Sequence, residues 1–348
     1  MSATAVAPLA PGRLAALVER VLAAAGADDE AAALVAGSLV ASDVRGVHSH
    51  GVIRVPDYVA GIRRGTIAPA ARPRALSAGG PMVALDGCSA FGQVAAAELV
   101  AAVATGARAH GICLGTLAGV AHVGRLGEWV ERLAQGGLIA LLWCNCGDPG
   151  GNVAPYGGAA AGIGTNPLAY AVPVSGRGPI VADFSTSAVS EGTVRVHRNA
   201  GRALPEGWII DAAGAPSTDP RALYAGGALL PMGGHKGFAL ALLVELLGGG
   251  LAGAGCASLG EAAGNGLALI AIDPAQSACG QGFAERAAAV AAAIAAVPAA
   301  APGEHVVLPG DPELAAAERV ARDGLELPAG TWAELAATAR SLGIDLDH

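Results

Sequence analysis

Short apolar runs that alternate with helical segments constrain the fold of this chain most. Between residues 80 and 210 these runs are bounded by Gly, Pro or Asp, as strands are, and they cover residues 82–85, 112–116, 139–144, 168–172 and 180–183. Helices are expected at 90–109 and 124–135, and a further strand is expected at 267–272. Strands that alternate with helices predict an α/β protein.

Helices are also expected at both ends of the chain. The first 40 residues carry apolar side chains at helical spacing, and Asp28 stands where it can cap the second of two helices. A short helix is expected from near Pro56 to Gly65. Further helices are expected at 236–248, 283–296, 312–322 and 331–342. We expect the N-terminal and C-terminal helical segments to pack together.

Composition and charge argue against several classes of protein. Hydrophobic residues make up 53% of the 348 residues, but the long charge-free stretch at 149–176 contains four prolines, so no membrane-spanning helix is expected. The 21 basic and 29 acidic residues form no basic block, so no nucleic-acid partner is expected. Six cysteines without a C-x-x-C pair, and an N-terminus without a signal peptide, predict a cytoplasmic protein with reduced thiols.

The phosphate-binding fingerprint of a Rossmann domain is not supported. The G-x-G-x-x-G match formed by Gly248, Gly250 and Gly253 follows a helix, whereas that fingerprint lies between a strand and a helix. A glycine-rich helix end explains this match better. The chain also lacks the P-loop, H-E-x-x-H and G-x-S-x-G motifs.

The first candidate for acid–base chemistry is Ser49-His50-Gly51, in a polar segment between two helices. The Ser49 hydroxyl can fix the tautomer of the His50 imidazole. Arg54, four residues on, can hold a carboxylate while His50 handles a proton. One alternative is a helix-end histidine with satisfied hydrogen bonds beside a surface arginine. Another is a metal pair of His48 with His50, for which no third ligand is obvious.

Two other segments are candidates. His122 follows a strand and a loop of small residues at 117–121 and precedes a helix that begins near Gly124. Loops in this position carry reactive groups in α/β proteins, although a capping histidine explains His122 equally well. Gly233-Gly234-His235-Lys236-Gly237 opens a helix, and its glycines, free N–H groups and lysine favour an anion site over a simple turn.

Together these segments resemble the malate/L-lactate dehydrogenase family that is distinct from the Rossmann-type enzymes of the same names. That family also includes ureidoglycolate, sulfolactate and diketogulonate oxidoreductases and piperideine-2-carboxylate reductases. The resemblance runs nearly from end to end. Its motifs, in shared order, are Arg45-Gly46, Ser49-His50-Gly51-Val52 with Arg54, His122 with Gly124, Val153-Ala154-Pro155 with Gly157-Gly158, Gly164-Thr165-Asn166-Pro167, Asp183-Phe184-Ser185-Thr186-Ser187, Gly234-His235-Lys236-Gly237 and Pro309-Gly310-Asp311-Pro312-Glu313.

The resemblance implies a non-Rossmann nicotinamide-binding domain with a mixed, largely antiparallel sheet. It also implies a helical domain formed by the N- and C-terminal segments, usually in a homodimer. The expected boundaries are 1–75 for the N-terminal helical segment that carries Ser49, His50 and Arg54, 76–265 for the cofactor-binding α/β domain, and 266–348 for a C-terminal segment that packs back on the N-terminal part.

The resemblance further implies roles for the site residues. His50 would be the proton donor and acceptor with Ser49 as its relay partner, and His122 would take part in acid–base work. Arg54 and Thr165 would hold a small carboxylate substrate. NAD or NADP would be bound by His122, Val123, Gly124, Asn145, Asp183, Phe184, Ser185, His235, Lys236, Pro309, Gly310 and Asp311. No metal is expected.

The chain departs from the family at Gly192-Thr193. Cyclic-imine reductases of the family carry a Gly-Asp pair at this position, and many members that act on hydroxy acids carry lysine. Thr193 fits neither pattern. The expected activity is NAD(P)-dependent hydride transfer at C2 of a 2-hydroxy or 2-oxo acid of the malate or lactate kind. One alternative is reduction of a cyclic or N-alkyl 2-imino acid. The other is a metal-dependent hydrolase or lyase that uses His48, His50 and His122.

Overall fold

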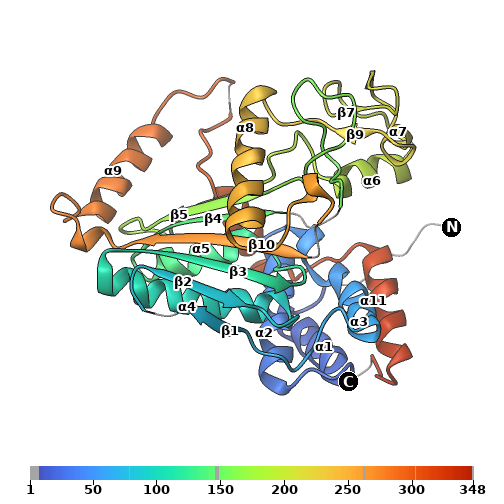
Figure 1. The fold of residues 1–348 in the computed structure, drawn as a ribbon, viewed down its shortest axis with the longest axis horizontal. Helices are drawn as coiled ribbons and strands as arrows, with labels where there is room; N and C mark the ends of the chain where they lie inside the picture. Colours follow the sequence, from blue (N-terminus) through green and yellow to red (C-terminus); the bar gives the residue numbers. More distant parts are fainter. Residues whose placement is uncertain (1–7, 78, 146–148, 262–263, 302, 347–348) are drawn as a thin grey trace.

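The computed structural model describes residues 8–77, 79–145, 149–261, 264–301 and 303–346, and a seven-stranded sheet runs through the middle of them (Figure 1). Its strands, in spatial order, are β1 (Arg74–Ser77), β2 (Met82–Asp86), β3 (Ile112–Val120), β10 (Asn265–Ile272), β4 (Ile139–Asn145), β5 (Leu168–Val172) and β6 (Ile180–Phe184). In this sheet β2 and β3 pair in parallel, and the other neighbours are antiparallel. The predicted α/β class and mixed, largely antiparallel sheet are confirmed.

Helices lie on both faces of this sheet (Figure 1). On one face, α4 (Gly92–His110) and α5 (Leu126–Gln135) bury Leu99 and Trp129 against the strands, and this layer forms the main hydrophobic core. On the other face stands α8 (His235–Val244), which continues into a π-helical turn, η3 (Glu245–Leu251).

A second core lies beyond one end of the sheet, among four helices. They are α1 (Pro11–Ala24), α2 (Asp29–Val44), α3 (Val55–Arg64) and α11 (Ala329–Ser341). Val18 of α1, Leu39 of α2 and Leu335 of α11 are fully buried in one cluster. The two ends of the chain therefore share one hydrophobic core, and Figure 1 shows the red C-terminal helix beside the blue N-terminal ones.

The remaining elements are peripheral. A small sheet of β7 (Ile209–Ile210), β8 (Pro216–Ser217) and β9 (Ala228–Leu229) lies with α6 (Glu191–Asn199) and α7 (Arg221–Tyr224) on the upper right of Figure 1. Helix α9 (Phe283–Ala295) projects on the opposite side, and α10 (Asp311–Asp323) packs near α2.

The predicted elements are present with small shifts of their ends, but the predicted loop at 117–121 is wrong. Strand β3 continues to Val120, because Leu117 and Val120 are buried and pair with β10. The small residues between them mark a bulge in this pair, where Gly119 has a φ of 70°. Accordingly α5 begins at Leu126, two residues later than predicted.

The sheet crosses the boundary predicted between residues 265 and 266. Strand β10 begins at Asn265 and lies between β3 and β4, so the first part of the predicted C-terminal segment belongs to the sheet. The later helix α11 lies against the N-terminal helices. None of the helices in the described ranges is both long and apolar enough to cross a membrane.

Candidate functional site

The segment after α2 folds around one buried carboxylate. Asp43, which is 2% exposed, accepts a hydrogen bond from Val52 N at 2.7 Å and lies 2.8 Å from His48 Nδ1. Gly51 is needed for this arrangement, because a Cβ at this position would lie 2.2 Å from the Asp43 carboxylate. Asp43 therefore fixes the turn that carries the predicted catalytic residues.

Two 3₁₀ turns, η1 (His48–His50) and η2 (Val52–Arg54), follow from this anchoring. Ser49 Oγ lies 2.9 Å from His50 Nδ1, the contact that the predicted relay pair requires. Arg54 Nε donates to the Ser49 carbonyl oxygen at 2.7 Å. Arg54 Nη1 lies 3.5 Å from Asp57 Oδ2, which is a long and weak contact.

His122 lies between the end of β3 and the start of α5, beside His50. The two ring centroids are 5.2 Å apart. His122 Nδ1 is 2.8 Å from the Tyr58 hydroxyl and 3.4 Å from Gly124 N. Gln93 Nε2 donates to the same tyrosine hydroxyl at 2.7 Å. The fold thus brings together two histidines that are far apart in the sequence.

These side chains line a cleft of about 500 Å³, a volume within the range of small-molecule and cofactor sites. The predicted site residues that line it are Ser49, His50, Arg54, His122, Val123, Gly124, Thr165, Asp183, Phe184 and Ser185. Its wall also contains residues that were not predicted, among them Arg125, Glu191, Arg195, Asn265 and Glu313.

A loop before β5 brings Thr165 to this cleft, and the end of β6 brings Asp183. Asn166, fully buried and with a φ of 39°, donates to Ala241 O at 3.0 Å and to Glu245 Oε2 at 2.9 Å. This anchoring holds the turn that presents Thr165. Asp183, near the end of β6, accepts a hydrogen bond from Gly127 N at 2.7 Å and so caps the first turn of α5.

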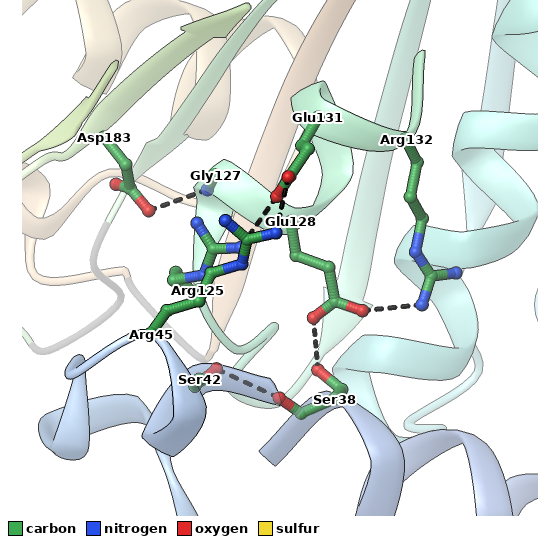
Figure 2. Close-up of polar contacts among 9 residues, drawn as sticks. All are labelled: Ser38, Ser42, Arg45, Arg125, Gly127, Glu128, Glu131, Arg132 and Asp183. Carbon is green, nitrogen blue, oxygen red and sulfur yellow. Dashed lines mark hydrogen bonds and ion pairs between the residues drawn. The ribbon is translucent and has the colours of Figure 1, made fainter. Parts of the chain in front are cut away.

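A buried network of charges connects α2 to α5 behind the cleft, and Figure 2 shows two guanidinium groups converging on Glu131. Glu131 pairs with Arg45 at 2.6 Å and with Arg125 at 3.2 Å. Glu128 accepts from Ser38 Oγ at 2.6 Å on the α2 side. Arg125 is 4% exposed, and its Nε finds no hydrogen-bond partner in the described part of the chain. This network fixes the position of the cleft wall at Arg125.

Burial and positive charge act together on the two cleft histidines. Burial, with smaller contributions from Arg54 and Arg125, lowers the pKa of His50 to about 4. Burial, helped by His50 and Arg54, also holds the pKa of His122 well below its ordinary value. Both imidazoles are therefore neutral at pH 7. In contrast, burial raises the pKa of the Asp183 carboxyl.

Several predicted cofactor residues lie outside the cleft wall. Asn145 is fully buried; its Nδ2 donates to Gly255 O at 2.9 Å and its Oδ1 accepts from Gly266 N at 2.8 Å. These bonds fasten the end of β4 to β10 and to the loop after η3. His235 and Lys236 open α8 and are exposed at its N-terminus.

The predicted motif at Pro309, Gly310 and Asp311 lies at the start of α10. Gly310, with a φ of 91°, packs against the backbone of Val181 in β6. Asp311 Oδ1 lies 2.5 Å from Arg177 Nη2, and its Oδ2 accepts from Leu308 N at 3.0 Å. The motif therefore lies beside the strand that carries Asp183, and Glu313, two residues after it, reaches the cleft.

The three histidines proposed as ligands in the metal-dependent alternative, His48, His50 and His122, do not line one common cavity. His48 lines a second cavity of about 260 Å³ with Arg319 and Asp323, whereas His50 and His122 line the cleft. Within the ranges that the structure describes, no group of three or more His, Cys, Asp or Glu side chains could hold a metal ion. The metal-dependent hydrolase or lyase therefore lacks its expected set of ligands.

Sequence reasoning missed four residues that organise this site: Asp43, Tyr58, Gln93 and Arg125. Tyr58 lies in the helix predicted from near Pro56 to Gly65, and the sequence alone assigns it no role in the site. A buried tyrosine needs a hydrogen-bond partner for its hydroxyl, and that requirement was the available signal. The partners come from the segment after β3 and from α4, which lie far from Tyr58 in the sequence, so local pattern could not identify them.

Comparison with known proteins adds independent findings. A family model of malate/L-lactate dehydrogenases matches residues 9–336. A Delta(1)-pyrroline-2-carboxylate/Delta(1)-piperideine-2-carboxylate reductase of Pseudomonas syringae pv. tomato is 36% identical over 281 residues, which cover 78% of this chain and 80% of that protein. Hydroxycarboxylate dehydrogenase B of Escherichia coli K12 is 32% identical over 331 residues, which cover 92% of this chain and 90% of that protein.

A solved structure of a related enzyme has the same fold. Sulfolactate dehydrogenase from Methanocaldococcus jannaschii superposes with a TM-score of 0.90 at 26% identity, over 98% of both chains. These matches define the class of the protein, which is an oxidoreductase enzyme. More specifically, the chain belongs to the malate/L-lactate dehydrogenase family, as its motifs predicted.

Proposed function

We propose that this enzyme interconverts a 2-hydroxy acid and a 2-oxo acid with NAD or NADP, and that His50 donates and accepts the proton. The observation that carries this proposal is the meeting of His50, His122, Arg54 and Thr165 in one cleft. A reaction of this kind needs a cation for the carboxylate and an acid–base group within reach of the C2 oxygen. The cleft supplies both.

Each side chain has a distinct task in this proposal. Arg54 Nε is committed to the Ser49 carbonyl and Nη1 makes only a weak 3.5 Å contact with Asp57, so the two Nη groups can grip the substrate carboxylate as a fork. Thr165 lines the same cleft and is assigned to the substrate with Arg54. The neutral His50 takes the proton from the C2 hydroxyl when the hydroxy acid is oxidised, and the protonated form returns it in reduction. Ser49 Oγ holds the His50 ring in place.

The cleft wall fits a nicotinamide cofactor in size and chemistry. Gly124 and Gly192 leave backbone accessible to a ligand, Ser185 and Ser190 supply hydroxyls, and Arg125 supplies a cation. When bound there, the cofactor supplies or accepts the hydride at C2. We further assign His122, Val123, Asp183, Phe184 and Ser185 to its binding, and the family motifs support adding His235, Lys236, Pro309, Gly310 and Asp311.

A substrate panel tests this function directly. The purified enzyme is given 2-oxo acids with neutral or anionic side chains, and cyclic 2-imino acids, each with NADH and NADPH, and cofactor oxidation is followed by absorbance. We expect a 2-oxo acid to give the highest kcat/KM, and His50→Ala to abolish most of that activity. If no 2-oxo acid were reduced faster than in the His50→Ala control, the proposal would be wrong.

Reduction of a cyclic 2-imino acid is the second candidate. It is favoured by the 36% identity to a relative named as a reductase of two such imines. Thr193 carries no acid group, and its Oγ1 contacts Ser190 Oγ at 3.0 Å at the start of α6. The same panel separates the two candidates, because an imine preferred over every 2-oxo acid would select the second.

The proposal includes a homodimer in the cytoplasm. Leu242, Leu246, Leu251 and Leu259 are between 43% and 69% exposed along α8 and the turns after it, which is unusual for large apolar side chains. A second copy of this chain would cover them. Light scattering of the wild type and of Leu246→Glu tests the dimer, which we expect the charged variant to weaken. Cys88, Cys113, Cys256 and Cys279 are free thiols, which supports a reducing compartment.

A further inference from the structure

The two cleft histidines are connected to the protein in different ways. Among the residues that the structure describes, the hydrogen-bond partner of His50 Nδ1 is the hydroxyl of Ser49, a group that can either donate or accept a hydrogen bond. His122 Nδ1 contacts the Tyr58 hydroxyl at 2.8 Å and the backbone N–H of Gly124 at 3.4 Å. The second partner of His122 can only donate, and this difference decides where the proton of His122 resides.

The tyrosine hydroxyl also acts as a donor toward His122. Gln93 is fully buried in α4, and its Nε2 donates to the Tyr58 hydroxyl oxygen at 2.7 Å. Because that oxygen accepts from Gln93, the hydroxyl hydrogen of Tyr58 is available for His122 Nδ1. Two donors, Tyr58 O–H and Gly124 N–H, therefore converge on one ring nitrogen. A nitrogen that accepts both cannot carry a hydrogen itself, so the hydrogen of the neutral ring is on Nε2.

We propose that Tyr58 and Gln93 are positioning residues that keep His122 neutral with its hydrogen on Nε2, so that His122 donates a hydrogen bond to the C2 oxygen while only His50 exchanges a proton. This inference rests on the function proposed above and assigns the two histidines separate tasks. It gives the cleft an electrophilic donor next to its acid–base group.

The surroundings of His122 support a ring that stays neutral. The charged or titratable groups that face it are His50, Arg54 and the Tyr58 hydroxyl, and further groups act on that hydroxyl from α3 and α5. Burial, helped by His50 and Arg54, lowers the pKa of His122 well below its ordinary value. Burial raises the pKa of Tyr58, which is 3% exposed, so its hydroxyl keeps the hydrogen that it donates.

The chemistry balances with one titrating histidine. In reduction, C2 gains a hydride with its electron pair from the reduced nicotinamide, the C2=O π bond opens onto oxygen, and that oxygen takes the proton of His50. His50 ends neutral, and His122 keeps its Nε2 hydrogen throughout. A fixed donor stabilises the charge that develops on the oxygen, which is the role of an oxyanion hole. Two imidazoles 5.2 Å apart also avoid both becoming cationic.

The decisive measurement is NMR of the cofactor-free enzyme with isotope-labelled histidine, in which the nitrogen shifts report the tautomer of each ring. The His122→Gln variant identifies the signals of His122. We expect an unprotonated Nδ1, a protonated Nε2 and no titration between about pH 5 and pH 8. A neutral His122 with its hydrogen on Nδ1, or a midpoint inside that range, would overturn the inference.

Variants then test the positioning role. Tyr58→Phe removes the donor and keeps the ring, and we expect a mixture of His122 tautomers, with kcat lower by roughly tenfold to a hundredfold and cofactor Kd unchanged. Tyr170→Phe in β5, outside the cleft wall, is the matched control and should keep wild-type kcat. Gln93→Met removes the donor to the Tyr58 oxygen, so the hydroxyl can accept a hydrogen bond from His122 instead of donating one. This variant should also give a mixture of His122 tautomers, and it replaces Tyr58→Phe if that variant does not fold.

These outcomes separate the inference from the proposed function. The tautomer is read without substrate, so an enzyme that reduces 2-oxo acids but shows Nδ1–H on His122 refutes the inference alone. An enzyme with the expected tautomer but no activity on any 2-oxo acid refutes the proposed function alone. A pure Nε2–H tautomer that persists in both Tyr58→Phe and Gln93→Met would show that these residues do not set it.

Discussion

Arg54→Lys is the substitution that most directly tests how the substrate is held. Arg54 Nε is fixed to the Ser49 carbonyl oxygen at 2.7 Å, which sets the guanidinium plane, and in the proposed function its two Nη groups hold the substrate carboxylate. Asp57 competes only weakly for Nη1, because the contact is 3.5 Å long and the Asp57 side chain is 68% exposed. Lysine keeps the charge but loses both the anchor and the planar fork.

The size of the effect follows from what is lost. One charge-assisted hydrogen bond contributes about 1.5–3 kcal/mol, so kcat/KM should fall by roughly tenfold to two hundredfold. KM should rise because the carboxylate is held less tightly. The value of kcat should fall as well, because a loosely held carboxylate lets C2 drift from the hydride path.

The assay compares steady-state kinetics of the preferred acid with those of its amide, in the wild type and in Arg54→Lys. The amide should be a poor substrate for the wild type but should lose little more from the substitution, because the charge that Arg54 recognises is already absent. Asp57→Asn is the matched control and should change kcat/KM by no more than a few-fold. Equal losses for the acid and the amide would mean that the carboxylate is gripped elsewhere.

Other outcomes test the rest of the site. His50→Ala should lower turnover by about 10²–10⁴ and leave cofactor binding nearly intact, and steady-state turnover within a few-fold of wild type would contradict its role. By NMR, His50 should titrate near pH 4 in the free enzyme, so its proton uptake on unfolding should lower stability as the pH falls from 6.5 toward 4; a midpoint near 6.5 would refute this. Lys236→Ala should weaken cofactor binding, most at low ionic strength, and an unchanged Kd by titration would remove the anion site at α8. Glu131→Gln should cost about 3–5 kcal/mol in denaturant unfolding, because it leaves the buried Arg125 without its acid partner, whereas Asp219→Asn in an exposed pair should leave stability almost unchanged.

Much of the fold could be predicted because its elements carry periodic patterns. The buried strands β4 and β5 are short apolar runs between turn residues, and the terminal helices keep a regular apolar face. The small sheet could not be predicted, because β7, β8 and β9 have two residues each and show no period. The end of β3 is misassigned from the sequence because Ala118 and Gly119 are typical loop residues, and only the pairing of Ala118 with β2 and of Val120 with β10 extends the strand past them.

The candidate site was predictable where its residues are neighbours in the sequence. Ser49, His50 and Arg54 lie in two consecutive 3₁₀ turns, so their spacing alone suggests a common task. The groups that act on the site come from other parts of the chain: Arg125, at the N-cap of α5, lowers the pKa of His50, and Gln93 of α4 contacts the Tyr58 hydroxyl beside His122. Such contacts depend on tertiary packing, so the sequence could indicate which groups react but not which groups tune them.

The charges around His50 connect substrate binding to proton transfer. In the free cleft, burial and the cations Arg54 and Arg125 keep His50 neutral, a form suited to take a proton but not to give one. In the proposed function, a substrate carboxylate on Arg54 would offset one of these cations and add a negative charge nearby, so we expect the pKa of His50 to rise when the carboxylate binds. The carboxylate would then also prepare the general acid that reduction needs. An uncharged substrate should therefore react poorly for two reasons, because it would be held loosely and would leave His50 without its proton.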